Sequence, residues 1–254
     1  MFRKAIQMKF LATLLIAGLC LAVNAQSSDL NGIVSRTDSV YSAELDAYLN
    51  LVIYEPEPMI ADGQFTPILY IFGDILFETF AGSINYLHRE LELIPNCILF
   101  GINEIPGKPF GSFQQEYASF ISTGLMEQLS AKYNLNGKGV LFGHSRASRL
   151  VGRVIQENPD YINRFILSAP WFTSEHLSEL EKSFSGRSER FSIYYSLSSE
   201  DLEMPDIREA KDNFADFLAK HQEVVQANYQ FFENETHMSI PPLSFYFGIK
   251  YLLQ

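Results

Sequence analysis

Ser145 lies between two small residues, Gly143 two positions before it and Ala147 two positions after it. The apolar run at residues 140–142 predicts a buried strand, and a segment with a helical pattern follows the serine at once. This arrangement is typical of a nucleophile elbow, a crowded strand-to-helix turn that lifts a serine hydroxyl above a sheet. Gly143 meets the demand for a small residue fully, and Ala147 meets it less fully. The alternative interpretation is a serine that caps an ordinary helix.

A serine hydroxyl attacks a carbonyl only when a base takes its proton and an acid orients that base. The sequence has five histidines: His88, His144, His176, His221 and His237. His237 lies in a polar loop after the last predicted strand, which would place it at the same sheet edge as Ser145. We therefore interpret His237 as the base, and the alternative is a solvated loop histidine. The side chain of His144 is expected to point away from the neighbouring serine. His176 falls in a polar stretch with a helical pattern, and His221 lies near the end of a predicted helix.

The acid is expected in the loop after the predicted strand at residues 191–197, because the order serine, carboxylate, histidine is typical of one class of hydrolases. Two carboxylates, Glu200 and Asp201, lie within reach of that strand end. The pattern alone does not choose between them, and either could instead cap the helix that follows. We favour Asp201 narrowly and keep Glu200 as the alternative.

The oxyanion of the tetrahedral intermediate needs preorganised backbone N–H donors. One donor is expected from Arg146, the residue after the serine, and a second from the loop that follows the predicted strand at residues 68–72. The candidate in that loop is the N–H of Asp74. Only its backbone is considered, because its carboxylate would repel an oxyanion.

The elements that must position these residues alternate between short apolar strands and amphipathic helices. Strands are predicted at residues 47–54, 68–72, 97–102, 140–142, 164–167, 191–197 and 224–232, and helices at 83–93, 114–133, 146–156, 207–221 and 241–252. This alternation predicts an α/β fold with one central, mostly parallel sheet and helices on both faces. Residues 26–40 are small and polar, which is typical of a partly mobile segment.

The first 25 residues resemble a secretory signal peptide. Arg3, Lys4 and Lys9 precede an apolar run at residues 10–23, and a small-residue cleavage pattern ends at Ala25. The run is shorter than the ~20 residues of a membrane-spanning helix, so no stable membrane insertion is expected after cleavage. We expect a single domain at residues 26–254 that is secreted or periplasmic.

Charge and composition exclude several classes of protein. Removal of residues 1–25 takes away three positive charges and no negative charge, so the net charge of −11 becomes −14, and such a chain repels nucleic acid. Only Cys97 then remains, in an apolar run, which excludes a disulfide framework and indicates a buried core residue. No histidine and carboxylate pair has the spacing of a metal site, and no glycine-rich nucleotide motif occurs. We expect no metal and no organic cofactor.

Several segments resemble the family of α/β hydrolases that includes esterase D and the ferric enterobactin esterase-like enzymes. Residues 67–74 resemble the family's strand motif PVLYLLDGD, residues 98–102 its VVVGI motif and residues 142–147 its GHSxGG motif. Residues 158–172 resemble its P-x-x-F to SPSxWW segment, and residues 235–237 its histidine segment. The resemblance covers nearly the whole chain after the leader.

The resemblance implies an α/β-hydrolase fold with Ser145 as nucleophile and His237 as base, and its register supports Asp201 as acid. It implies a serine carboxylic-ester hydrolase that acts on a small-molecule, carbohydrate or siderophore ester. One departure bears on substrate recognition, because Asn103 begins the segment where the family often has an arginine. That departure and Ala147, which replaces a glycine, leave open a hydrolase fold that has lost catalysis.

Two alternatives to the esterase remain open. A peptidase or acyltransferase would use the same three residues. A hydrolase fold that has lost catalysis would instead bind a sugar or a partner protein. The oligomeric state is left open by the sequence.

Overall fold

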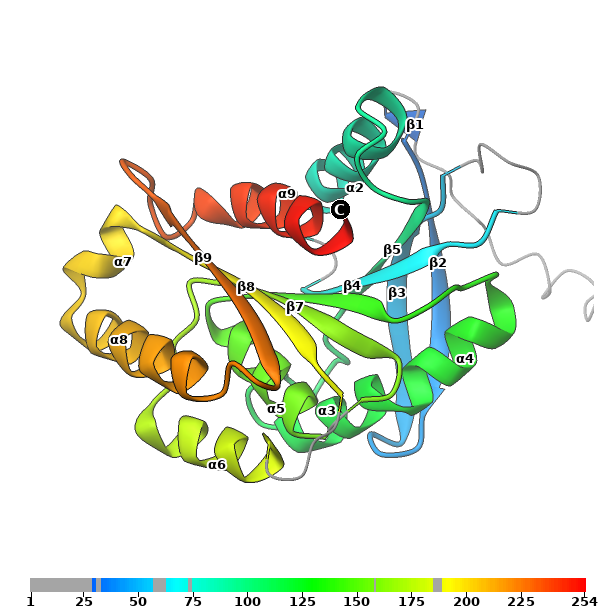
Figure 1. Ribbon diagram of the computed structural model, residues 1–254. Coiled ribbons are helices and arrows are strands. Elements are labelled where there is room, and N and C mark those ends of the chain that lie inside the picture. The colour runs from blue at the N-terminus through cyan, green and yellow to red at the C-terminus, as the bar shows by residue number, and fades with distance from the viewer. Residues whose placement is uncertain (1–28, 31–32, 57–62, 73–74, 158, 185–188) are drawn as a thin grey trace, which may run out of the picture.

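The computed structural model describes residues 29–30, 33–56, 63–72, 75–157, 159–184 and 189–254. These residues form one nine-stranded sheet with helices on both faces (Figure 1). The predicted α/β class and the central, mostly parallel sheet are therefore confirmed. The predicted leader at residues 1–25 lies outside the described residues.

The strands are β1 (Asp29–Leu30), β2 (Ile33–Ser42), β3 (Ala47–Tyr54), β4 (Thr66–Ile71), β5 (Cys97–Ile102), β6 (Gly139–His144), β7 (Ile162–Ser168), β8 (Phe191–Ser198) and β9 (Val225–Phe232). Their order across the sheet is β1-β2-β3-β5-β4-β6-β7-β8-β9. Strands β4 to β9 pair in parallel, and β1, β2 and β3 form an antiparallel edge beside β5. The parallel strands therefore bring their carboxyl ends to one edge of the sheet, where sites form in such folds.

The helices are α2 (Phe77–Asn85), which continues as a π-helical turn, η1 (Tyr86–Glu90), then α3 (Gln114–Ser122), α4 (Gly124–Lys132), α5 (Arg146–Gln156), α6 (Ser174–Phe184), α7 (Ser199–Glu203), α8 (Pro205–Lys220) and α9 (Ile240–Leu253). Helices α2 and α9 cover one face of the sheet, and α3, α5 and α6 cover the other (Figure 1). None of the described helices has the length and apolar character that crossing a lipid bilayer requires.

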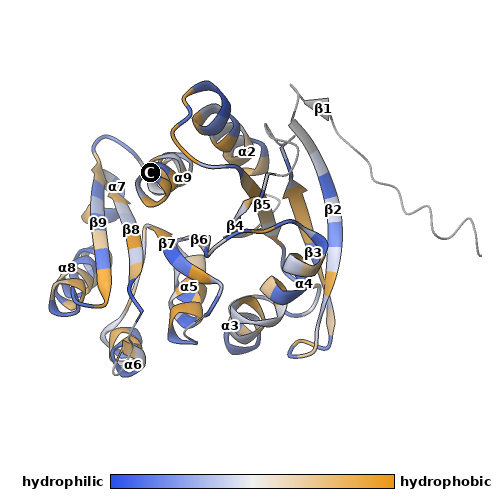
Figure 2. Cartoon of the chain, turned by 45° about the vertical axis from the view of Figure 1, so that its right-hand side comes forward, coloured by the Kyte–Doolittle hydropathy of each residue, from blue (hydrophilic) through white to orange (hydrophobic). Residues whose placement is uncertain are grey.

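The inner strands are buried on both of their faces. Leu69 of β4 packs in the core beneath α3 and α5, while its neighbours Ile68 and Tyr70 pack on the opposite side beneath α2 and α9. Cys97 is also fully buried, as predicted. Because both faces are covered, these strands appear in the sequence as continuous apolar runs rather than as alternating patterns. Figure 2 shows the hydrophobic residues concentrated on the central strands.

The prediction of a partly mobile segment at residues 26–40 is wrong for most of its described part, because β2 runs from Ile33 to Ser42. Strand β2 pairs with β3 along eight residues of each strand, from Ser35 opposite Tyr54 to Ser42 opposite Ala47. It lies near the edge of the sheet and is largely hydrophilic (Figure 2). Its mostly polar composition gives no strand pattern in the sequence, although Val40 and Ser42 at its end are buried.

The helix predicted at residues 114–133 is divided into α3 and α4 at Thr123, whose φ of −130° and ψ of −75° are not helical. The hydroxyl of Thr123 donates to the carbonyl of Ser119, 3.0 Å away, and Gly124 follows. Threonine and glycine both favour helices weakly, so the break occurs where propensity is lowest. The helix predicted at residues 83–93 begins earlier, at Phe77, and ends in the π-helical turn.

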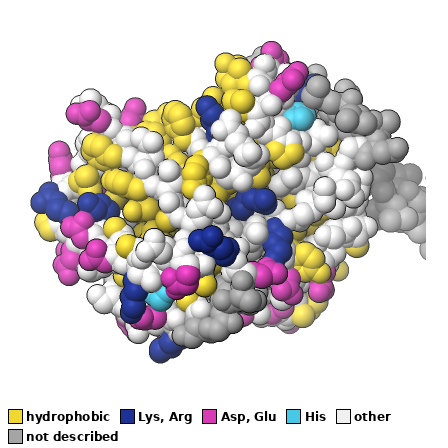
Figure 3. Space-filling model, in the orientation of Figure 1, with side chains coloured by type: hydrophobic (Ala, Val, Ile, Leu, Met, Phe, Trp, Pro, Cys, Tyr) yellow, Lys and Arg dark blue, Asp and Glu magenta, His cyan; other side chains and the backbone are white. Residues whose placement is uncertain are grey.

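Aromatic side chains are exposed on the last strand and the last helix. Figure 3 shows hydrophobic side chains gathered over this part of the visible face, with acidic and basic side chains mixed around them. Tyr229 and Phe231 of β9 and Phe247 of α9 are all exposed. The exposed side chains of β9, the last strand of the sheet, are therefore uncharged.

Candidate active site

Ser145 lies in the tight turn between β6 and α5. Its φ of 52° and ψ of −120° fall in a region that non-glycine residues rarely adopt. Its N–H donates to the carbonyl of Ser168 on β7, 2.8 Å away. Its hydroxyl makes no capping hydrogen bond to α5, so the interpretation as an ordinary helix cap is wrong. The strained backbone has the form that a nucleophile elbow requires.

Gly143 is the position in this turn that has no room for a side chain. A Cβ atom at this position would lie 2.6 Å from Cγ2 of Val151 and 2.8 Å from the carbonyl oxygen of Ala147, both shorter than van der Waals contact. Ala147 is itself 2% exposed, and its methyl group packs in the core. The turn therefore demands glycine at position 143 and accommodates alanine at position 147.

His237 lies in the loop between β9 and α9, and its ring contacts the carboxylate of Asp201 on α7. The Nδ1 atom of His237 is 2.6 Å from Oδ1 of Asp201, whose side chain is fully buried. An ionised carboxylate can only accept hydrogen bonds, so Nδ1 carries the hydrogen and Nε2 keeps its lone pair. This is the tautomer that a general base needs.

The contact shifts the pKa of both groups. The hydrogen bond to Asp201 raises the pKa of His237 above its usual value, against the opposing effect of burial. Burial raises the pKa of Asp201, but the hydrogen bonds from His237 and from Ser198 outweigh it and hold this pKa below its usual value. The pair therefore combines a carboxylate that stays ionised with an imidazole that is more basic than a free one.

The second carboxylate oxygen of Asp201 takes part in capping the N-terminus of α7. Oδ2 accepts hydrogen bonds from the N–H and the hydroxyl of Ser198, each at 2.8 Å, and the N–H of Asp201 donates to Oγ of Ser198 at 3.1 Å. This reciprocal arrangement is a capping box. Capping, considered above as the alternative for this carboxylate, therefore coexists with the contact to His237, because each oxygen serves one of the two purposes.

Glu200 contacts the backbone of the histidine loop rather than the imidazole ring. Its Oε2 accepts the N–H of His237 at 2.7 Å. The neighbouring Ser199 accepts the N–H of Asn234 at 2.9 Å. These bonds fasten the loop to α7. Both candidate acids thus lie beside His237, and Asp201 is the one whose carboxylate meets the ring.

His144 lies beside His237, a position that sequence reasoning missed. The centroids of the two rings are 4.6 Å apart, and His144 lines the same cavity as Ser145, although its side chain was predicted to point away from the serine. Its Nδ1 lies 3.0 Å from Oγ of Ser168, to which Ser244 donates at 3.0 Å. Burial, and then the neighbouring His237, lower the pKa of His144 to about 4. A neutral imidazole therefore packs against His237 at neutral pH.

The two predicted oxyanion donors differ in where they lie. Arg146 is the first residue of α5, so its N–H has no acceptor in a preceding helical turn. It lies directly after Ser145 and lines the same cavity. Asp74, the second predicted donor, lies outside the described residues.

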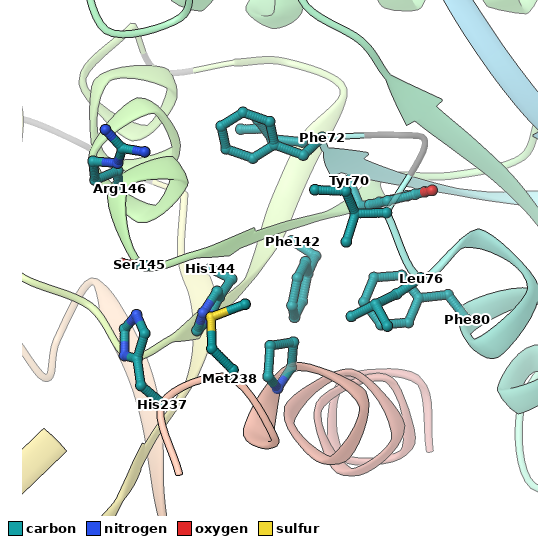
Figure 4. A pocket seen from close by; sticks show the side chains of 13 residues that line it. Tyr70, Phe72, Leu76, Phe80, Phe142, His144, Ser145, Arg146, His237 and Met238 are labelled. Carbon is teal, nitrogen blue, oxygen red and sulfur yellow. The ribbon is translucent and has the colours of Figure 1, made fainter. Parts of the chain in front are cut away.

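An apolar cavity of about 430 Å³ adjoins Ser145. Its walls are mainly aromatic and aliphatic and include Tyr70, Phe72, Ile75, Leu76, Phe80, Phe142, Met238 and Pro241. Figure 4 shows Ser145, His144 and His237 at one end, and Leu76 and Phe80 at the other. A cavity of this size and lining suits a small organic molecule.

The remaining histidines lie elsewhere in the fold. His176 pairs with the hydroxyl of Thr173, and the ring of His221 packs on that of Phe217. His88 contacts the carbonyl of Ile94 through Nδ1. In the described part of the chain, no group of three or more His, Cys, Asp or Glu side chains is arranged to hold a metal ion.

No protein-family model and no curated protein matches this chain. Solved structures do match. An IroE-like serine hydrolase from Shewanella oneidensis has a TM-score of 0.76 at 18% identity, over 86% of this chain and 80% of that chain. The siderophore hydrolase EstA from Aspergillus nidulans has a TM-score of 0.72 at 14% identity, over 89% of this chain and 97% of that chain. An S-formylglutathione hydrolase from Agrobacterium tumefaciens has a TM-score of 0.64 at 12% identity, over 89% of this chain and 95% of that chain.

These structural neighbours confirm the resemblance that the sequence motifs indicated, and at such identities they establish the fold. The chain therefore has the α/β-hydrolase fold and is similar in structure to the esterase D and siderophore esterase group.

Proposed function

We propose that this protein is a serine esterase that hydrolyses a carboxylic ester through an acyl-enzyme. The observation that carries the proposal is the 2.6 Å contact between His237 and the buried Asp201, beside the strained turn of Ser145 on one apolar cavity. The similarity in fold to a siderophore hydrolase and an S-formylglutathione hydrolase supports ester cleavage as the reaction class.

In the first half of the reaction, the hydroxyl oxygen of Ser145 attacks the ester carbonyl and Nε2 of His237 takes the proton. The charge that develops on the imidazole is stabilised by the carboxylate of Asp201. The oxyanion accepts a hydrogen bond from the N–H of Arg146, with the N–H of Asp74 as the proposed second donor. Collapse of the tetrahedral intermediate expels the alcohol, which receives the proton from His237.

In the second half, a water molecule attacks the acyl-enzyme while His237 takes one of its protons. The proton returns to Oγ of Ser145 as the acid leaves, so the enzyme is regenerated without any change in net charge. Each step uses groups that belong to the chain itself. The proposal therefore requires no metal and no organic cofactor.

The proposed substrate is a small-molecule ester, because the cavity beside Ser145 has the size and lining of a small-molecule site. Siderophore and carbohydrate esters belong to this class.

We further propose that residues 1–25 are a signal peptide, that residues 26–254 form one domain, and that the mature protein acts in the periplasm or outside the cell.

The inactive binding protein is the weaker alternative. It depended on Ala147 and on the absent family arginine. The packing of the methyl group of Ala147 in the core removes the first of these objections, since the turn is crowded at Gly143 instead. The same geometry would serve a peptidase or an acyltransferase, so comparison of aryl esters with matched amides is part of the test.

A fluorophosphonate probe tests the nucleophile directly, because it bonds to an activated serine and ignores ordinary hydroxyls. We expect labelling of the folded protein at Ser145, and loss of both labelling and esterase activity in Ser145→Ala. Ser174→Ala, which makes the same chemical change at an exposed serine of α6, is the matched control and should leave both unchanged. Absence of labelling in the folded wild-type protein would refute the proposal.

A further inference from the structure

A second cavity of about 420 Å³ lies against the other side of the nucleophile turn. It shares Phe72 and Arg146 with the apolar cavity, so these two side chains stand between the two spaces. Figure 4 shows Arg146 on the side of Ser145 that is away from Leu76 and Phe80. The reacting carbonyl of an ester bound at Ser145 would therefore lie where the two cavities meet.

The second cavity is lined by both polar and apolar residues and includes two arginines, whereas the first cavity is mainly apolar. Its lining includes Glu104, Ser112, Gln114, Arg146 and Arg149. Arg146 and Arg149 are three positions apart on α5, which places them on one face of the helix. Two arginine residues thus line one space beside the proposed nucleophile.

Neither arginine has an ion pair with a carboxylate among the described residues, whereas Arg153 on the next turn pairs with Glu179 at 2.7 Å. The guanidinium of Arg149 lies over the ring of Trp171, 4.7 Å from its centroid, and Nε donates to the carbonyl of Trp171 at 3.3 Å. This stacking orients the group without neutralising its charge. The chain has a net charge of −11, so two arginines in one cavity differ from the acidic character of the chain as a whole.

Among the residues that the structure describes, Glu104 is the single acidic side chain in the lining of the second cavity. Its Oε1 accepts the N–H of Phe110 at 2.7 Å, so this carboxylate has a partner in its own loop. The two arginines therefore outnumber the opposing charge among the described lining residues, and neither forms an ion pair with a carboxylate there. Guanidinium groups bind carboxylate and phosphate groups with paired hydrogen bonds.

We propose that the substrate is an anionic ester: an apolar group occupies the first cavity, and a carboxylate or phosphate group on the other side of the ester binds Arg146 and Arg149. This inference rests on the proposed esterase function and deepens it. It assigns Arg149 as a specificity residue and gives the side chain of Arg146 a role separate from that of its backbone N–H.

Matched ester pairs test this substrate class. One pair carries the charge on the alcohol side, 4-carboxyphenyl butyrate against 4-carbamoylphenyl butyrate. The other carries it on the acyl side, the 4-nitrophenyl monoester of adipic acid against that of adipamic acid. We expect the anionic member of one pair to be preferred about tenfold in kcat/KM at low salt, and the preference to shrink as salt screens the charges. The pair that responds identifies which side of the ester lies in the second cavity.

Three substitutions show whether the arginines cause the preference. Arg149→Gln should reduce the ratio of anionic to neutral turnover toward one, and Arg149→Lys should retain more of it. Glu104→Gln, which keeps the acceptor for Phe110 but removes the opposing charge, should raise the ratio. Arg190→Gln is the matched control, because Arg190 is exposed before β8 at the opposite end of the strands, and the ratio should not change.

The outcomes separate this inference from the proposed function. Turnover of neutral esters with no anionic preference, or a preference that survives Arg149→Gln, would overturn the anionic substrate class and leave the esterase intact. Failure of the wild-type protein to hydrolyse any of the four esters, together with no labelling of Ser145, would overturn both.

Discussion

Asp201 and His237 are 36 positions apart in the sequence, yet the Oδ1 atom of the first lies 2.6 Å from the Nδ1 atom of the second. The carboxylate reaches the ring from a fixed direction, because its other oxygen is bound by the N–H and the hydroxyl of Ser198. The capping box of α7 thus preorganises the contact that orients the imidazole.

Asp201→Asn should lower kcat by roughly 10³-fold or more, because an amide can present its N–H to Nδ1 and stabilise the wrong imidazole tautomer. Steady-state kinetics on an aryl ester measure the change. Glu200→Gln is the control: it retains an acceptor for the N–H of His237 and should cost less than about tenfold. A larger loss in Glu200→Gln than in Asp201→Asn would contradict the assignment of Asp201 as the acid.

Ser198→Ala should affect both stability and catalysis. Loss of the capping hydroxyl is expected to cost about 1 kcal/mol of unfolding free energy, which a urea titration measures. It also removes one bond that orients Asp201, so kcat should fall, though less than in Asp201→Asn. An unchanged kcat together with the lower stability would show that the cap does not position the acid.

The pH dependence of kcat/KM should have an acidic limb that belongs to His237. The hydrogen bond to Asp201 raises the pKa of His237 above its usual value. The general base must be neutral, so activity should be lost as pH falls through this raised pKa. His144, with a pKa near 4, stays neutral through this range and does not contribute. The acidic limb should move to lower pH in Asp201→Asn. If the limb stays at the same pH in this variant, it belongs to a group other than His237.

Gly143→Ala should disrupt the nucleophile turn. The added methyl group would lie 2.8 Å from the carbonyl oxygen of Ala147, and a backbone atom cannot move aside as a flexible side chain can. We expect a loss of about 1–3 kcal/mol of unfolding free energy and a fall in kcat beyond that explained by unfolded protein. The reverse change, Ala147→Gly, should cost about 1 kcal/mol or less and leave kcat within twofold. Equal effects of the two variants on kcat would contradict the difference in crowding.

Phe245 of α9 packs behind two of the aromatic rings that line the apolar cavity. It is fully buried, stacks on Phe80 with ring centroids 4.1 Å apart, and lies edge to face with Phe142 at 5.7 Å. Phe245→Ala should cost about 3–5 kcal/mol, measured by chemical denaturation, and should raise KM because Phe80 and Phe142 line the cavity. Phe247→Ala on the same helix removes an exposed ring and should cost less than about 1 kcal/mol.

Local chemistry in the sequence was sufficient for the inner strands of the sheet and for the positions of Ser145 and His237 in the fold. The turn at Ser145 could be predicted because its crowding is set by residues within a few positions of it, and glycine at position 143 marks it. His237 could be predicted because the carboxyl ends of parallel strands share one edge, so loop position and order along the chain determine its location. The polar strand β2 escaped prediction, since its pairing with β3 is a long-range contact that leaves no apolar pattern.

Tertiary structure alone decided how neighbouring residues divide their roles. Glu200 and Asp201 are adjacent and chemically alike, and only the short helix α7 turns one carboxylate toward the ring and the other toward the loop backbone. His144 meets His237, and Arg149 stacks on Trp171, through the packing of elements distant in sequence. A sequence pattern specifies which face or loop a side chain occupies. The direction in which that side chain points, and therefore the atom that it contacts, depends on the atoms that surround it in the folded chain.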